Sequence, residues 1–282
     1  MTTSLCERQT RHPWRLGPWP ALVSVALAAL LAGCAQQPVA TSAVTTARGE
    51  PMTASDEPDA RRRARIRLEL ASSYFEQGQT TVALDEIKLS LAADPTYPMA
   101  YVLRGLVYMR LNEARLADES FQRALALNPR DPDALHNYGL FACEQGRYVQ
   151  AIEQFDRALA SANYGGQSRS LLAKGVCQVR AGRLEDAEAS LARSYELDPG
   201  NPITAYNLAS LQFRRGELTR SQFTIRRVNN SQFANAETLW LGIRVERRLG
   251  NQAVVMQLAD QLSRRFPDSQ EWAVYQRGAF ND

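Results

Sequence analysis

The side chains best suited to nucleophilic or metal chemistry are few in this chain. The 282 residues include only four cysteines and two histidines: Cys6, Cys34, Cys143, Cys177, His12 and His136. None of them stands at the CxxC or HxxxH spacing of a metal site. No nucleophile elbow lies near His136, and no glycine-rich loop is of the kind that holds a phosphate. We therefore expect no catalytic residue, metal, cofactor or small-molecule substrate, and interpret His136 as a polar residue lining a binding groove.

Cys34 stands where a different chemistry is expected. An apolar run over residues 21–31 (ALVSVALAALL) follows Arg8, Arg11 and Arg15 and leads to LAGC at residues 31–34. A basic start, a short apolar run and small residues at its end are typical of an export signal, since a spanning helix needs about 20 apolar residues. The LAGC stretch resembles the lipobox of bacterial lipoproteins, whose cysteine is acylated and becomes the new N-terminus. The alternatives are an ordinary signal peptide, or a short buried helix that happens to contain Cys34.

The lipobox interpretation predicts the compartment. Residues 1–33 would be a signal peptide, and Ala35 is not the aspartate that retains many Gram-negative lipoproteins in the inner membrane. We therefore expect a lipid anchor in the outer membrane, facing the periplasm. Residues 34–60 lack aromatic side chains and are too polar to form a core, so they are interpreted as a flexible tether of roughly 25–30 Å.

The net charge gives no reason to expect a nucleic-acid partner. Without the signal peptide the chain has 30 basic and 29 acidic side chains, a net charge of +1. Extended basic surfaces attract nucleic acid, but the longest basic cluster here is RRRAR at residues 61–65. We interpret that cluster as the solvated start of the first helix; binding to anionic lipid headgroups is the alternative.

The remainder of the chain repeats itself. Gly105 to Gly139, Phe121 to Phe155 and Pro95 to Pro129 are each steps of 34 residues. Small residues are paired where two antiparallel helices would approach most closely: Ala71 with Ala83, Gly105 with Ala117, Gly139 with Ala151, Gly175 with Ala187. The turns between helices are predicted at residues that tolerate positive φ, namely Gly78, Asn112, Gly146, Gly182 and Gly216.

This pattern resembles the tetratricopeptide repeat, which implies an all-α, right-handed superhelical solenoid. Within residues 61–282 we expect six repeats, at about 64–97, 98–131, 132–165, 168–201, 202–234 and 235–267. A C-terminal helix that starts at Asp268 or Ser269 would cap the stack. Repeat five is degenerate at Ser221 and Ile225, and repeat six is recognised from Leu241 and Gly242 and from Phe266 and Pro267. A two-residue insertion at residues 164–166 is expected to loosen the joint between repeats three and four.

The repeat register also relates the two cysteines that would remain after export. Cys143 and Cys177 lie at nearly the same height in the first helices of repeats three and four. First helices of adjacent repeats stack side by side, so a disulfide across the joint is predicted in the oxidising periplasm. Two separately buried thiols are the alternative.

A narrower resemblance rests on runs more specific than the repeat consensus. NYGLFAC at residues 137–143, KGVC at 174–177, LWLGIR at 239–244 and RFPDSQE at 265–271 resemble the PilF/PilW lipoproteins of type IV pilus biogenesis. The resemblance covers the lipobox and all six repeats, and it departs in repeats one and five. Some PilW-like members have cysteines at both matching positions, which adds support to the disulfide.

That resemblance implies a pilotin, an outer-membrane lipoprotein that helps the PilQ-like pilus secretin reach the membrane and multimerise. The open alternative is another periplasmic repeat lipoprotein that scaffolds β-barrel assembly or cell-wall hydrolases. In either case the expected partner is a protein and the expected role is not catalytic.

The partner-binding groove is predicted from the repeat positions that line the concave surface in this fold: the second, fifth, ninth, twelfth and thirteenth. In repeats one and two these positions give an apolar strip, which consists of Leu68, Ser72, Phe75, Met99, Val102, Leu106 and Met109. Exposed apolar strips mark interaction sites, and methionines adapt to varied partners. The alternative is that the tether or a neighbouring helix covers the strip. The same positions in repeats four to six include Arg180, Arg214, Glu246 and Arg247, which indicates an ordinary solvated face.

Overall fold

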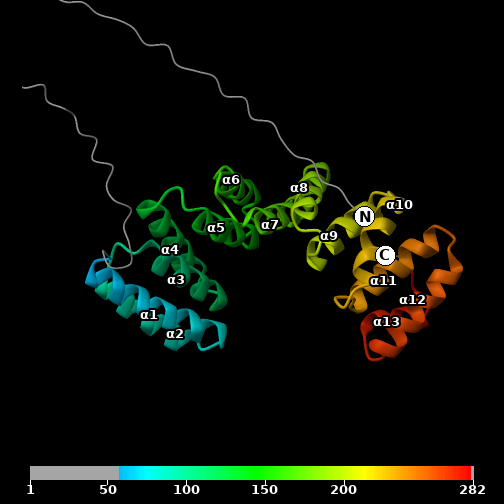
Figure 1. Cartoon of the computed structure of the whole chain (residues 1–282), viewed down its shortest axis with the longest axis horizontal. Coiled ribbons are helices and arrows are strands. Elements are labelled where there is room, and N and C mark those ends of the chain that lie inside the picture. Colours follow the sequence, from blue (N-terminus) through cyan, green and yellow to red (C-terminus); the bar gives the residue numbers. More distant parts are fainter. Residues whose placement is uncertain (1–56, 281–282) are drawn as a thin grey trace, which may run out of the picture. The chain divides into compact units, whose positions relative to one another are not determined.

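A computed structural model describes residues 57–280 (Figure 1). The predicted signal peptide, the lipidation site Cys34 and all but the last four residues of the predicted tether lie outside the described residues. Within residues 57–280 the chain forms helices and turns without strands, so the all-α prediction is confirmed. No helix in that range is long and apolar enough to cross a membrane.

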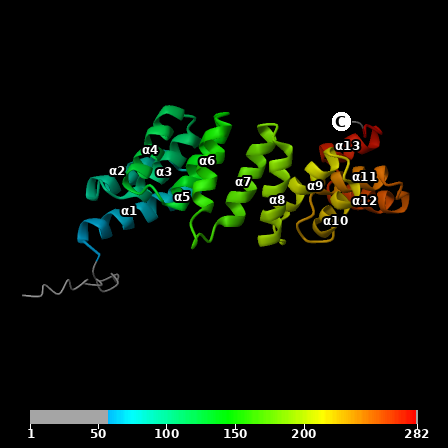
Figure 2. The ribbon, with the colours of Figure 1, turned by 90° about the horizontal axis from the view of Figure 1, so that it is seen from above.

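The helices form antiparallel pairs, and each pair packs against the next (Figure 2). In chain order they are α1 (Asp59–Glu76), α2 (Thr80–Ala93), α3 (Pro98–Arg110), α4 (Ala114–Leu127), α5 (Pro132–Glu144), α6 (Tyr148–Leu159), α7 (Gln167–Arg180), α8 (Leu184–Leu197), α9 (Pro202–Arg214), α10 (Leu218–Asn229), α11 (Ala236–Arg248), α12 (Gln252–Arg265) and α13 (Gln270–Gln276). The odd-numbered helices α1 to α11 are called A helices below, and their even-numbered partners B helices.

The turn within each pair depends on a left-handed residue. All five predicted positions have positive φ, from 57° at Asn112 to 79° at Gly216. After α3, the amide of Asn112 donates to Met109 O at 3.0 Å and that of Glu113 to Tyr108 O at 2.9 Å. These two hydrogen bonds satisfy carbonyl groups that have no partner within the helix. They form only when the residue at the turn, here Asn112, has the left-handed conformation. Gly250, with φ of 78°, holds the same position after α11 and was missed in the sequence.

The small residues of the A helices accommodate large side chains of the B helices. A Cβ added at Gly105 would lie 2.7 Å from the Phe121 ring, and one at Gly139 would lie 2.8 Å from the Phe155 ring. The sequence paired these glycines with Ala117 and Ala151, which are also fully buried. The closest approach is nevertheless to the aromatic ring one turn later on the B helix.

Repeat six begins one residue later than the sequence suggested. The left-handed Gly250 lies fifteen residues into a repeat that starts at Ala236, where α11 begins. Gly242, which the sequence took as the small residue of the pair, instead faces α10, where an added Cβ would lie 2.4 Å from Asn229 Nδ2. The residue at the glycine position is the fully buried Ile243, and the residue at the position of Phe121 and Phe155 is the small Ala259. In this repeat the large side chain is on the A helix and the small one on the B helix, the reverse of the earlier repeats. Taking Gly242 as the small A-helix residue therefore placed the repeat one residue too early.

The C-terminal helix caps the last pair, as predicted. Ser269 rather than Asp268 starts α13, because its Oγ accepts the amide of Trp272 at 3.1 Å. Trp272, Val274 and Tyr275 pack against the apolar cluster of α11 and α12. This contact covers the core of the terminal repeat, which has no following repeat within the described residues.

Candidate functional site

The A helices of the central repeats line an apolar cavity of about 350 Å³. Its apolar lining comprises Leu140 on α5, Leu172, Ala173 and Val176 on α7, and Ile203 on α9, and its charged lining comprises Glu144, Arg169 and Arg180. All of these except Ala173 occupy the repeat positions that the sequence assigned to the groove. An apolar cavity with charged groups at its border is suited to hold apolar side chains of a peptide, with polar contacts that fix their orientation.

His136 lines this cavity but is largely covered. Its side chain is 6% exposed and packs against the Phe155 ring, with centroids 5.8 Å apart. Its Nδ1 lies 2.8 Å from Ser170 Oγ, and that oxygen lies 2.8 Å from the Tyr164 hydroxyl. Burial, and secondarily the nearby positive charge of Arg169, lower the pKa of His136 to about 4. The ring is therefore neutral at neutral pH. It joins α5 to Ser170 on α7 and, through Ser170, to Tyr164 in the α6–α7 connection.

The two-residue insertion is packed rather than loose, contrary to the sequence-based expectation. Tyr164 is 6% exposed and lies in an apolar cluster with Leu135 and Ala158. Its hydroxyl also accepts Arg169 Nε at 3.3 Å, and Arg169 forms an ion pair with Asp133. The extra residues thus supply a buried tyrosine that fixes the joint between repeats three and four.

A disulfide crosses the same joint. Cys143 on α5 and Cys177 on α7 are bonded in the structure, with their Cα atoms 5.9 Å apart. Both are buried, and Cys143 also lines the apolar cavity. The bond therefore connects the two A helices that supply most of the cavity lining.

The predicted strip in repeats one and two differs from the expectation. Leu68 and Val102 are only 8% and 3% exposed and belong to the core, because α3 packs on α1 and α5 packs on α3. The prediction that they lie exposed in a groove is therefore wrong.

The other strip residues are mostly half-covered. The Arg110 guanidinium carbon lies 3.8 Å from the centroid of the Phe75 ring, and its Nη1 donates to Phe75 O at 2.6 Å. Ser72, Leu106 and Met109 are half-buried, and Met99 is 37% exposed. The position of a residue within its own repeat does not predict how much of its side chain the next A helix covers.

The solvated face expected for repeats four to six also needs one correction. Glu246 is 1% exposed and accepts hydrogen bonds from Gln222 Nε2 at 2.8 Å and Asn251 Nδ2 at 2.6 Å. With the repeat starting at Ala236, the thirteenth position is held by the exposed Arg248. Because of the one-residue error in register, the sequence analysis assigned the buried Glu246 to the groove in place of the exposed Arg248.

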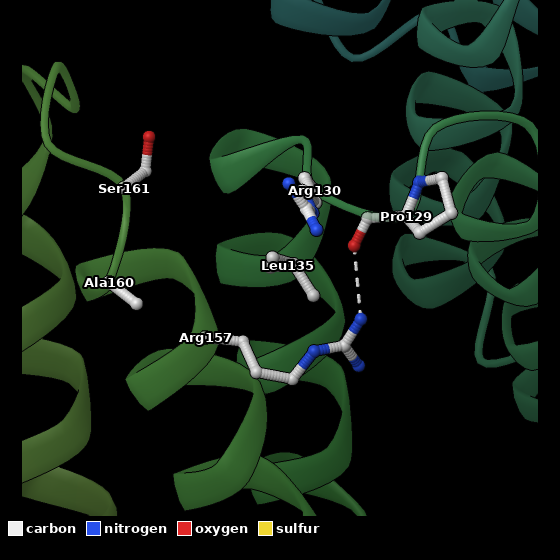
Figure 3. Close-up of a pocket in the computed structure, with 6 residues that line it drawn as sticks. All are labelled: Pro129, Arg130, Leu135, Arg157, Ala160 and Ser161. Carbon is white, nitrogen blue, oxygen red and sulfur yellow. Dashed lines mark hydrogen bonds between the residues drawn. The ribbon is translucent and has the colours of Figure 1, made fainter.

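A larger cavity of about 600 Å³ lies where α4 is connected to α5 and α6 ends (Figure 3). Its lining includes Leu135 and Ala160, the hydroxyl of Ser161, and the guanidinium groups of Arg130 and Arg157. Arg157 Nη2 donates to Pro129 O at 3.0 Å, which holds that guanidinium across the cavity. The sequence did not predict this cavity, which combines Leu135 of α5 and Arg157 of α6 with residues of the loops that flank them.

Comparisons with known proteins agree with this architecture. Tetratricopeptide-repeat models match residues 100–131 and 130–200. The type IV pilus assembly protein PilF of Pseudomonas aeruginosa is 28% identical over 238 residues, which cover 84% of this chain and 93% of PilF. An uncharacterized protein of Haemophilus influenzae is 27% identical over 135 residues, covering 48% of this chain and 75% of that protein.

Solved structures give the same relation. The structure of PilW, described as a widely conserved type IV pilus biogenesis factor, has a TM-score of 0.69 at 29% identity and covers 76% of this chain and 98% of PilW. The structure of P. aeruginosa PilF has a TM-score of 0.71 at 25% identity, covering 78% of this chain and all of that structure.

The helix pairs, their left-handed turns and the repeat matches define a tetratricopeptide-repeat protein. Within that class the chain is homologous to PilF, and its structure is similar to those of PilW and PilF, two tetratricopeptide-repeat proteins of type IV pilus biogenesis. The resemblance inferred from the sequence is confirmed.

Proposed function

We propose that this protein is an outer-membrane lipoprotein that acts as a pilotin in type IV pilus biogenesis. Acylation at Cys34 anchors it at the periplasmic face of the outer membrane. The repeats bind the pilus secretin, promote its arrival at that membrane and favour its multimerisation. The role is that of a non-catalytic scaffold.

The observation that carries this proposal is the homology to PilF, which extends over nearly the whole of both chains. Agreement confined to the repeats would support only a shared fold, because tetratricopeptide repeats serve many unrelated functions. The lipobox at residues 31–34 adds an independent argument for the membrane anchor.

The cavity between α5, α7 and α9 is the part of the A-helix surface best suited to the partner. Its lining from Leu140, Leu172 and Val176 offers apolar surface to an apolar segment of the secretin. The accessible residues of the strip in repeats one and two, such as Met99 and the half-buried Phe75, would extend this contact.

A binding experiment with matched variants tests this site. Leu140→Glu/Val176→Glu places two carboxylates in the cavity and is expected to abolish co-purification of the detergent-solubilised secretin. Val149→Glu makes the same kind of change at a residue of α6 that is 82% exposed, and it is expected to leave binding intact. Circular dichroism of all variants establishes that they fold.

The outcomes separate the site from the function. Equal secretin recovery with the cavity variant and with Val149→Glu would show that the cavity is not the site. If the wild type recovers no secretin but does recover β-barrel assembly components or cell-wall hydrolases, a different scaffold role would replace the pilotin proposal.

A further inference from the structure

The last two repeats and the capping helix carry more positive than negative charge. Residues 202–280 contain eleven arginines, no lysine and six carboxylates, a net charge of +5. Part of this excess is neutralised, because Arg215 and Arg220 form ion pairs with Glu185 and Glu188 of α8, and Arg264 pairs with Asp260. In the described part of the chain, Arg247 and Arg248 take part in no ion pair.

These two arginines lie with Arg244 in the last turns of α11, and together with Phe213 and Phe280 they line a cavity of about 180 Å³. Residues three and four apart on a helix are neighbours, so the guanidinium groups of Arg247 and Arg248 each experience the like charge of Arg244. The C-terminal end of a helix offsets part of this repulsion, and an anion in the cavity would offset more.

The aromatic rings hold the guanidinium groups in a geometry suited to carboxylates. The guanidinium carbon of Arg247 lies 3.7 Å from the centroid of the Phe280 ring. Those of Arg244 and Arg248 lie 4.8 and 5.3 Å from the centroid of the Phe213 ring. A guanidinium that contacts an aromatic face keeps N–H groups at its edge for bidentate hydrogen bonds to a carboxylate.

The cluster also continues the A-helix surface described above. Phe213 is the twelfth residue of its repeat, and Arg244, Arg247 and Arg248 are the ninth, twelfth and thirteenth of theirs, the same positions that line the apolar cavity in repeats three and four. We infer that the Arg244, Arg247, Arg248, Phe213 and Phe280 cluster binds an acidic segment of a protein partner. This is a second contact surface, separate from the apolar cavity and independent of whether the partner is the secretin.

Fluorescence anisotropy with defined peptides tests the inference. The full-length lipoprotein in detergent is titrated into a fluorescein-labelled pentaglutamate peptide and into its pentaglutamine counterpart. The acidic peptide is expected to bind, and its affinity to fall with added salt. Arg247→Gln/Arg248→Gln is expected to weaken binding at least about 10-fold, because charge-assisted hydrogen bonds are lost.

Arg226→Gln/Arg227→Gln is the matched control, since it removes the same charge from two exposed adjacent arginines of α10. It is expected to change the affinity less than about two-fold, because screening at physiological ionic strength limits the effect of distant charges. An equal loss in both double variants would mean that only net charge matters and would overturn the inference.

Two further outcomes would also overturn it. Arginine-dependent binding of glycerol 1-phosphate without binding of the peptide would assign the cluster to lipid headgroups. A benzophenone-bearing acidic peptide is expected to crosslink to α9 or α11 in the wild type. This measurement does not depend on whether the variants fold. Crosslinks confined to α10 or α12 would place the acidic segment elsewhere.

Discussion

At the scale of single residues, the molecule depends on buried groups whose neighbours fix their size and charge. His136 is neutral because it is buried, and it shares a hydrogen-bonded chain with Ser170 and Tyr164. Gly105 and Gly139 are required by the rings of Phe121 and Phe155. The sequence predicted small residues at Gly105 and Gly139 and a polar residue at His136. It did not predict the aromatic rings or the burial, because these depend on what lies across the helix pair or the joint.

His136 predicts a dependence of stability on pH. Its pKa falls from 6.5 to about 4 on folding, mainly through burial. The unfolded chain therefore binds the proton first, and the contribution is complete above pH 6.5 and lost as the pH falls from 6.5 towards 4. Up to about 3 kcal/mol is at stake. Urea denaturation of the wild type and His136→Gln at pH 7 and pH 4.5 measures it, and the wild type is expected to lose more stability than the variant. Equal losses would contradict the assignment.

Gly139 predicts an energetic coupling with Phe155. Gly139→Ala gains up to about 1 kcal/mol of helix propensity but brings a Cβ to within 2.8 Å of the ring, and overpacking costs about 1–3 kcal/mol. We expect net destabilisation. Gly139→Ala/Phe155→Ile reproduces the alanine and isoleucine found at these positions in repeats one and five, and it is expected to lose at least about 0.5 kcal/mol less than the sum of the single variants. Additive losses in urea denaturation would show that the two positions do not compete for space.

At the scale of elements, the 34-residue period predicted the helix pairs and their turns, and a capping residue after the last repeat predicted the C-terminal helix, because each has a local residue signal. Gly78, Gly146, Gly182 and Gly216 are examples in which one residue type determines a turn. The register of repeat six was not predicted, because Ile243 and Ala259 exchange the sizes used in the earlier repeats. The exposure of Leu68 and Val102 was also misjudged, because it depends on how closely the next A helix packs.

The disulfide between α5 and α7 is an element-scale prediction for the purified protein. It closes a loop of 34 residues in sequence separation, and in the chain-entropy model it contributes roughly 3–4 kcal/mol to stability. Reduction by dithiothreitol is expected to lower the urea midpoint of the wild type and to leave Cys143→Ser/Cys177→Ser unchanged. Under denaturing, non-reducing conditions, maleimide should modify neither cysteine. Modification of both would mean that the thiols are separate.

At the scale of the whole molecule, the repeats would act where the lipid anchor holds them. The described residues contain an apolar cavity lined by α5, α7 and α9 and a basic cluster in repeats five and six. Under our proposals each is a contact surface for a protein partner. The sequence predicted a groove on the A helices and a protein partner. It placed that groove in repeats one and two, where Leu68 and Val102 are buried in the core rather than exposed.

The lipid anchor is required for the proposed role and gives a prediction at this scale. Cys34→Ser is expected to give a soluble periplasmic protein that folds normally but does not bring the secretin to the outer membrane. Mass spectrometry of the wild type is expected to find an acylated cysteine at the mature N-terminus. An unmodified N-terminus in the mature wild type would rule out the anchor.

The central claim is that this protein promotes assembly of the pilus secretin, and the amount of multimeric secretin in the outer membrane tests it most directly. Outer membranes from a deletion strain, and from the same strain complemented with the wild-type gene or with Leu140→Glu/Val176→Glu, are compared by immunoblotting of detergent-resistant multimers. We expect multimers to be reduced by the deletion, restored by the wild type and not restored by the cavity variant. Undiminished secretin multimers in the outer membrane of the deletion strain would contradict the account.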